Sequence, residues 1–135
     1  MAATTHRSSA EIVRNAYEAF AEGDMEACAA LMAPEVEWFE PEGSRYAGTY
    51  TGFEAILEHV FEPSMEDIVG MEVHPDQFID CGETVVVLGN FEGMGPESGD
   101  HFSIPFAHVC ACEDGQITEF RNYTDTAAWR DLYPR

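Results

Sequence analysis

The spacing of apolar residues changes halfway along the chain, and this change restricts the fold more than any other feature. Before residue 62, apolar side chains recur mostly every three or four positions, which is typical of helices. From residue 69 onward, four segments rich in Val, Ile and Phe are separated by short stretches containing Gly and Asp, which is typical of strands joined by turns. Helices followed by a meander of strands predict an α+β fold, with the helices packed on one face of an antiparallel sheet.

Capping residues, glycines and prolines mark the predicted ends of the helices. Ser8 begins a capping box ahead of the first helix, and Gly23 ends that helix. Asp24 caps the second helix, and Pro63 closes the third. The predicted helices span residues 9–23, 25–32 and 52–61, the strands residues 36–41, 69–79, 84–91, 102–112 and 117–123, and a short terminal helix residues 125–132.

Length and composition indicate one folded domain. The chain has 135 residues, 45% of them hydrophobic, which suffices to bury a core. Residues 1–8 form a polar lead without the apolar segment of a secretory signal, and residues 9–135 form the domain. No apolar run approaches the roughly eighteen residues of a membrane helix. We therefore expect a cytoplasmic protein that does not enter membranes.

Acidic side chains dominate the charge. The chain has 26 Asp and Glu residues, six Arg and no Lys, and its formal net charge is −20. Such a surface repels nucleic-acid phosphates and anionic lipids, so we expect neither partner. We hypothesise a host with a salty cytoplasm, where ions would screen the repulsion within the folded protein. An ordinary acidic protein also fits the composition.

Four cysteines, at positions 28, 81, 110 and 112, show none of the Cys and His spacings of a zinc site. We expect all four to be reduced and most of them to be buried as small apolar side chains. The sequence therefore predicts no metal and a function that needs no cofactor.

A carboxylate lies beside an indole at the end of the first predicted strand. Residues 36–41 read Val-Glu-Trp-Phe-Glu-Pro, and the two-residue period of a strand places Val36, Trp38 and Glu40 on one face. Burial beside the indole would raise the pKa of Glu40 towards that of a general base. The alternative is a solvated glutamate beside a core tryptophan.

Five short motifs in order resemble the SnoaL-like branch of the nuclear-transport-factor-like superfamily, which includes ketosteroid isomerase. The motifs span nearly the whole chain and are Tyr17–Asp24, Met32–Trp38, Tyr46–Gly52, Cys112–Ile117 and Tyr123–Asp125. The resemblance implies a cone in which a curved antiparallel sheet wraps on three N-terminal helices and encloses an apolar pocket. It also implies a homodimer that packs through the outer faces of the sheets.

The resemblance also assigns roles to particular positions. In the isomerases the catalytic base precedes the proline that ends the first strand, and this position is Glu40 here. The tyrosine of their oxyanion hole falls on Ala16, next to Tyr17. Their aspartic acid falls on Ala107 or, with a shift of one residue, on His108.

The direction in which His108 points stays open. It shares a strand face with Phe106 and Cys110, but the opposite face is apolar as well, so parity does not separate the pocket from the dimer interface. In the pocket, His108 would donate a hydrogen bond or exchange a proton.

The last strand contributes one polar side chain to the expected pocket. Alignment on the family turns Phe120 and Asn122 inward, where the Asn122 amide would bind the ligand, Glu40 or a water. Arg121 alternates outward together with Ile117, so we do not expect the Asp-Arg-Asp chemistry of the epoxide hydrolases that share this fold.

We therefore predict a pocket protein that transfers a proton on an apolar or polycyclic small molecule, as an isomerase, cyclase or dehydratase. Glu40 would be the general base, and His108, Asn122 or Tyr17 would stabilise the developing oxyanion. The predicted walls for the substrate are aromatic: Trp38, Tyr46, Phe61, Phe91 and Phe120. The alternative is a non-catalytic domain on the same fold that binds a ligand or dimerises.

Overall fold

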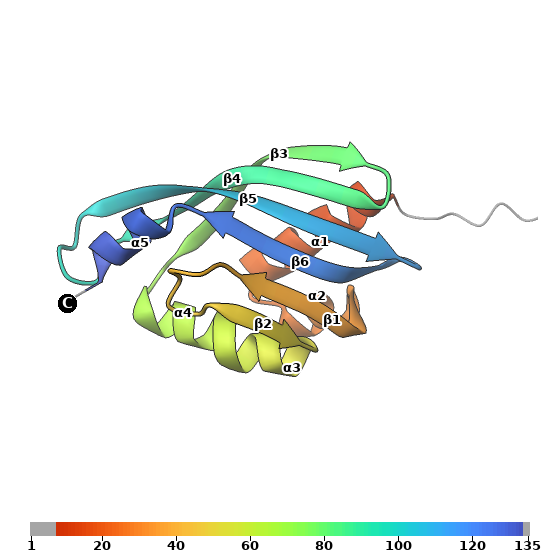
Figure 1. Ribbon diagram of the computed structural model, residues 1–135, viewed down its shortest axis with the longest axis horizontal. Helices are drawn as coiled ribbons and strands as arrows, with labels where there is room; N and C mark the ends of the chain where they lie inside the picture. The colour runs from red at the N-terminus through yellow and green to blue at the C-terminus, as the bar shows by residue number, and fades with distance from the viewer. Residues whose placement is uncertain (1–7, 134–135) are drawn as a thin grey trace, which may run out of the picture.

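A curved six-stranded sheet forms the centre of the molecule (Figure 1), in a computed structural model that describes residues 8–133. The strand order is β2–β1–β6–β5–β4–β3. The strands are β1 (Met32–Glu40), β2 (Gly48–Thr51), β3 (Glu72–Cys81), β4 (Thr84–Met94), β5 (His101–Glu113) and β6 (Gln116–Thr124). The predicted α+β class and the four strands of the second half are confirmed. Of the predicted polar lead, only Ser8 lies within the described residues.

One pair of strands departs from the expected antiparallel sheet. β1 and β6 are parallel, whereas every other neighbouring pair is antiparallel. The chain leaves β2 through a helical segment before it enters β3. β1 and β6 are therefore joined by a long crossover and not by a hairpin, which allows the two strands to run parallel. β2 itself was not predicted, because its four residues lie in a stretch that reads as a glycine-rich loop.

The helices lie on the concave side of the sheet and at its ends (Figure 1). They are α1 (Ser9–Ala21), α2 (Met25–Ala30), α3 (Phe53–Ile56), the π-helical turn η1 (Leu57–Phe61), α4 (Glu62–Asp67) and α5 (Thr126–Leu132). The caps predicted at Ser8 and Asp24 are confirmed, and Asp125 caps α5 in the same way. The side chains of Ser8, Asp24 and Asp125 accept hydrogen bonds from backbone N–H groups in the first turns of α1, α2 and α5.

Two predicted helix ends are wrong. The second helix ends at Ala30, and Met32 already belongs to β1, because a residue before a proline such as Pro34 favours extended backbone. The third helix does not stop at Pro63 but continues to Asp67. The wide π-helical turn just before Pro63 accommodates the missing N–H and the ring of the proline.

Three pairs of strands contain a register shift: β1–β6 between Met32 and Glu37, β3–β4 and β5–β6. The β3–β4 register shifts between Pro75 and Gln77, beside Gly89, where an added Cβ would lie 2.2 Å from the His74 carbonyl oxygen. The β5–β6 register shifts as well, and this shift turns Ile117 inward. Our prediction that Ile117 faces outward is therefore wrong, since its side chain is 1% exposed.

All four cysteines are free thiols. Cys28, Cys110 and Cys112 are buried, and Cys81 is exposed.

Between residues 8 and 133, no helix has both the length and the apolar character needed to cross a bilayer.

Candidate functional site

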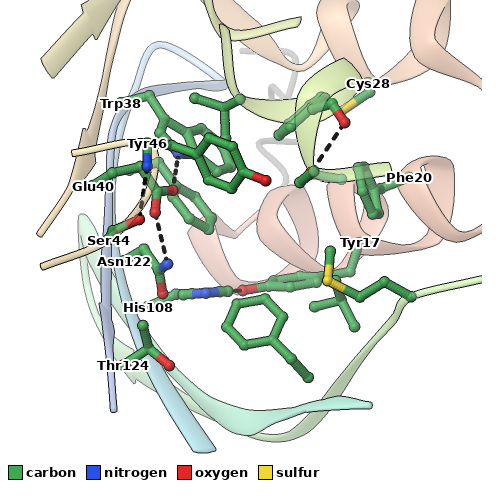
Figure 2. Close-up of a pocket in the computed structure, with 18 of the residues that line it drawn as sticks. Tyr17, Phe20, Cys28, Trp38, Glu40, Ser44, Tyr46, His108, Asn122 and Thr124 are labelled. Carbon is green, nitrogen blue, oxygen red and sulfur yellow. Dashed lines mark hydrogen bonds between the residues drawn. The ribbon is translucent and has the colours of Figure 1, made fainter. Parts of the chain in front are cut away.

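A cavity of about 120 Å³ lies between α1, the concave face of the sheet and the π-helical turn (Figure 2). Its walls are mainly aromatic. The Trp38 and Phe120 rings stack with centroids 3.8 Å apart, and Phe61 packs edge-on against Trp38 at 5.1 Å. Trp38 and Phe120 lie on neighbouring parallel strands at the same register position, which explains the stack. The cavity therefore offers a flat, rigid apolar wall.

Glu40 brings a carboxylate into this apolar space. Strand alternation in β1 turns Val36, Trp38 and Glu40 to the concave side, as predicted, and Glu40 is only 6% exposed. Trp38 Nε1 donates a hydrogen bond to Oε2 over 2.7 Å, and Asn122 Nδ2 donates one to Oε1 over 3.0 Å. Burial raises the pKa of Glu40 above its ordinary value, and these two hydrogen bonds oppose the rise.

Both hydrogen-bond donors of Glu40 are neutral. Within residues 8–133, none of the ion pairs involves Glu40. Arg45 also lines the cavity, but its guanidinium pairs with Asp67 at 3.3 Å and stacks over the Tyr133 ring. The carboxylate of Glu40 therefore retains its ability to take up a proton.

His108 lies in the cavity wall on β5, so the structure places it on the pocket side. Its ring stacks on Phe106 at a centroid distance of 3.8 Å, and its Nδ1 contacts the hydroxyl of Tyr17 from α1. Burial lowers the pKa of His108 to about 3, opposed in part by the neighbouring Asn122 amide. The imidazole is therefore neutral at physiological pH.

Asn122 links Glu40 to His108. It pairs with His108 across the β5–β6 ladder, and Figure 2 shows its side chain between the two. Its Nδ2 is used by Glu40, but its Oδ1 and the Nε2 of His108 are both buried without a well-formed hydrogen bond to another described residue. A buried amide oxygen or ring nitrogen without a hydrogen bond lowers the stability of the folded protein. The two atoms are therefore expected to bond to each other, to a ligand or to a water.

A second polar cluster lies around Tyr46, which also lines the cavity. The Tyr46 hydroxyl donates a hydrogen bond to Asp67 Oδ2, and its backbone carbonyl accepts one from Tyr50. Burial raises the pKa of Tyr46, and the hydrogen bond to Asp67 adds to the rise. These contacts hold the loop between β1 and β2 against α4.

All nine residues predicted for the site line this one cavity. They are Glu40, His108, Asn122, Tyr17, Trp38, Tyr46, Phe61, Phe91 and Phe120. Arg121 does not line it and instead pairs with Glu119 on the outer face at 2.8 Å. Sequence reasoning missed seven polar and aromatic lining residues, namely Phe20, Ser44, Arg45, Ser64, Thr124, Trp129 and Tyr133. The only signal for Trp129 and Tyr133 was the predicted terminal helix, whose packing partner the sequence did not reveal.

The donor set suits organic chemistry better than metal binding. Among the described side chains, no three His, Cys, Asp or Glu residues gather closely enough to hold a metal ion. The polar groups that reach the cavity include one carboxylate, a phenol, an amide and a neutral imidazole. They can bind and move protons on a small molecule.

Residues 13–120 match the family model of the SnoaL-like domain. An NTF2-like protein from Burkholderia thailandensis E264 is 32% identical, with a TM-score of 0.87 over 95% of this chain and 99% of that chain. An NTF2-like protein of unknown function from Burkholderia pseudomallei K96243 is 32% identical, with a TM-score of 0.84 over 96% and 100% of the two chains. TerC, co-crystallised with polyporic acid, is 31% identical, with a TM-score of 0.82 over 92% and 96%. The comparison with curated proteins gave no match.

Proposed function

The chain belongs to the SnoaL-like family, and we propose that it binds an apolar, ring-containing small molecule in the cavity and moves a proton on it. A shared fold does not fix an activity, since such scaffolds carry unrelated functions. The proposal therefore depends on the site itself, and first of all on Glu40.

The observation that carries the proposal is the buried carboxylate of Glu40 with no cationic partner among the described residues. An acid whose pKa is raised by burial can take a proton from carbon near neutral pH and return it. The most suitable proton lies on a carbon next to a carbonyl, because the carbonyl oxygen accepts the charge that develops. Glu40 would be the general base of an isomerase, a cyclase or a dehydratase.

Tyr17 is the donor that we propose for the developing oxyanion. Its hydroxyl belongs to the cavity wall and is held by the imidazole of His108. Burial holds the pKa of Tyr17 well above its ordinary value, so the phenol keeps its proton. His108 and Asn122 would hold the two reacting side chains in position. Nδ1 of His108 contacts the hydroxyl of Tyr17, and Nδ2 of Asn122 donates a hydrogen bond to Glu40.

The aromatic walls favour a flat ring system as the ligand. The stacked Trp38 and Phe120 rings would lie parallel to a bound ring, and Phe61 and Phe91 would enclose its edges. TerC, the similar protein co-crystallised with polyporic acid, supplies the first compound to test. Binding to this chain would raise its melting temperature.

Proton abstraction can be measured without knowing the product. Ring-containing ketones, together with polyporic acid, would be incubated with the protein in D2O, and the uptake of deuterium at carbon would be followed by NMR. We expect catalysed exchange with the wild type and none with Glu40→Gln. The matched control is Glu37→Gln, which removes the same charge from the exposed face of the same strand and should leave the exchange intact. Undiminished exchange in Glu40→Gln would rule out Glu40 as the base.

A non-catalytic ligand-binding protein is the second candidate. Both oxygens of Glu40 accept hydrogen bonds, and these bonds stabilise a permanently ionised carboxylate as well as a reactive one. In that case ligands would raise the melting temperature while no compound exchanged its protons.

We also propose that the protein is a cytoplasmic homodimer formed through the outer face of the sheet. Ile79, Leu88 and Tyr123 are large side chains that are 36–42% exposed on strands β3, β4 and β6. Free cysteines suit a reducing compartment. Light scattering of the wild type and of Leu88→Glu would test the dimer, since a charge at this face should shift the protein to the monomer.

A further inference from the structure

Four polar side chains follow one another along the cavity wall: Glu40, Asn122, His108 and Tyr17 (Figure 2). The Asn122 amide lies 3.0 Å from Glu40 Oε1, and the Tyr17 hydroxyl contacts His108 Nδ1. Between these two contacts lie Asn122 Oδ1 and His108 Nε2, two buried atoms on a cross-strand pair that have no hydrogen-bond partner among the described residues. The other polar side-chain atoms of the pair are already used, and the Asn122 amide acts on the pKa of His108 as a hydrogen-bond partner would. We therefore take Oδ1 and Nε2 to be partners, and the four side chains then form one hydrogen-bond chain from the acid to the phenol.

The ionised acid fixes the direction of every link. A carboxylate only accepts hydrogen bonds, so Asn122 must present its NH2 group to Glu40 and its oxygen to His108. The imidazole must then carry its single proton on Nε2, where it faces that oxygen. Its Nδ1 is left as an acceptor, and the hydroxyl of Tyr17 donates to it. In this state the proton of Tyr17 is not free for a ligand.

Protonation of Glu40 reverses the direction of each hydrogen bond between the four side chains. Trp38 Nε1 donates to Oε2, so that oxygen must remain an acceptor and an added proton belongs on Oε1, on the side of Asn122. The amide then has to turn its oxygen to Glu40 and its NH2 group to His108. Nε2 becomes an acceptor, the single imidazole proton lies on Nδ1, and Nδ1 donates to the oxygen of Tyr17. The proton of Tyr17 is released to the cavity.

We propose that the protonation state of Glu40 sets the direction of this chain, so that Tyr17 donates a hydrogen bond to a bound ligand only when Glu40 holds a proton. The inference rests on the proposed function, in which Glu40 takes a proton from the substrate. Uptake of that proton turns Tyr17 into a donor at the moment when the substrate oxygen becomes negative. Apart from the proton gained by Glu40, the number of protons is unchanged: water in the cavity takes the proton from Nε2 of His108 and returns one to Nδ1, so the imidazole stays neutral. Asn122 and His108 are positioning residues in this account.

Glu40→Gln is the sharpest test, because Trp38 fixes the orientation of the new amide. The Nε1–H of Trp38 needs an acceptor, so the oxygen of the introduced amide must face Trp38 and its NH2 group must face Asn122. Asn122 then has to turn its own oxygen to residue 40, as it does for the protonated acid. NMR of the ring nitrogens reports which nitrogen of His108 carries the proton. We expect the Nε2–H form in the wild type near pH 8 and the Nδ1–H form in Glu40→Gln.

Two control variants separate the chain from a general effect of charge. Glu37→Gln, on the exposed face of β1, should keep the Nε2–H form of the wild type. Asn122→Ala removes the middle link, so the tautomer of His108 should no longer depend on whether residue 40 carries a carboxylate or an amide. The same tautomer in the wild type and in a folded Glu40→Gln would overturn the proposal, even if deuterium exchange still depended on Glu40. Loss of the exchange activity alone would leave the tautomer result untouched.

The unmodified protein offers the same test through pH, should Glu40→Gln fail to fold. Glu40 takes up its proton at a pH above its ordinary pKa of 4.5, and His108 does so only at about 3, so the tautomer should reverse between these two events. The other titratable groups in or beside the cavity are phenols, thiols and one guanidinium: Tyr17, Tyr46, Tyr50, Tyr133, Cys28, Cys110 and Arg45. The phenols and thiols all have a raised pKa and stay protonated in this range, and Arg45 is paired with Asp67. A tautomer ratio that does not change as Glu40 titrates would contradict the proposal.

Discussion

Buried neutral histidine makes the protein sensitive to acid, and His108 should carry much of this sensitivity. Its pKa falls from 6.5 to about 3 on folding, because burial disfavours the imidazolium. The unfolded chain therefore takes up a proton that the folded chain refuses. The contribution of His108 to the free energy of unfolding is complete above about pH 6.5 and is lost as pH falls towards 3.

The size of the effect follows from the shift. Below pH 6.5 each tenfold rise in proton concentration favours the unfolded chain roughly tenfold, so lowering the pH from about 7 to about 4.5 should remove roughly 2–3 kcal/mol. The full shift corresponds to about 5 kcal/mol. Urea unfolding of the wild type and of His108→Gln at both pH values measures the difference. Any change that acidification makes outside the Glu40–Asn122–His108–Tyr17 chain affects both proteins alike and cancels.

We expect the wild type to lose roughly 2–3 kcal/mol more than His108→Gln over this range. His74→Gln is the matched control, because the His74 side chain is 45% exposed and does not line the cavity. It should therefore follow the wild type. If the wild type and His108→Gln lost stability in parallel, the imidazole would be reached by water and protons in the folded protein, and our account of the cavity wall would be wrong.

Three further predictions concern the same acid and the surface. Glu40→Gln should stabilise the protein above the folded-state pKa of Glu40, because the amide avoids the cost of burying the ionised carboxylate, and it should have little effect below pH 4.5. Urea unfolding curves at about pH 4 and pH 8 measure the difference, and a variant that is less stable at the higher pH would count against a raised pKa. Trp38→Phe keeps a ring against Phe120 but removes the hydrogen-bond donor to Oε2 of Glu40. The pKa of Glu40 should therefore rise further, and the free energy of unfolding should fall by about 1–2 kcal/mol. An unchanged NMR titration of Glu40 would contradict this prediction. Because the net charge is −20, the melting temperature should rise with added KCl, and no rise up to molar salt would argue against the salty-cytoplasm hypothesis.

Much of the fold could be predicted because local rules act alone at most positions. Ser8, Asp24 and Asp125 cap helices with their own side chains, and the strands of the second half are marked by their composition and turns. The prediction fails where contacts with residues distant in the sequence determine the local structure. β2 forms only because β1 offers an edge, and the helix passes Pro63 only through a π-helical turn.

The same distinction applies to the site. Strand parity and the following proline sufficed to turn Glu40 inward. Parity did not decide for His108, because both faces of β5 are apolar. The contact between His108 and Tyr17 joins residues 91 positions apart, and the Trp38–Phe120 stack depends on a parallel pairing that the sequence did not reveal.

At Glu40, burial outweighs two hydrogen bonds, so the pKa of the carboxyl group is raised and the acid is able to exchange protons. A pH titration of the side-chain carboxyl carbons by NMR, with Glu40→Gln to assign the signal, measures this balance. Our account predicts a midpoint for Glu40 above the ordinary 4.5. A midpoint at or below 4.5 would make Glu40 a fixed structural anion held by Trp38 and Asn122, and would contradict its role as a base.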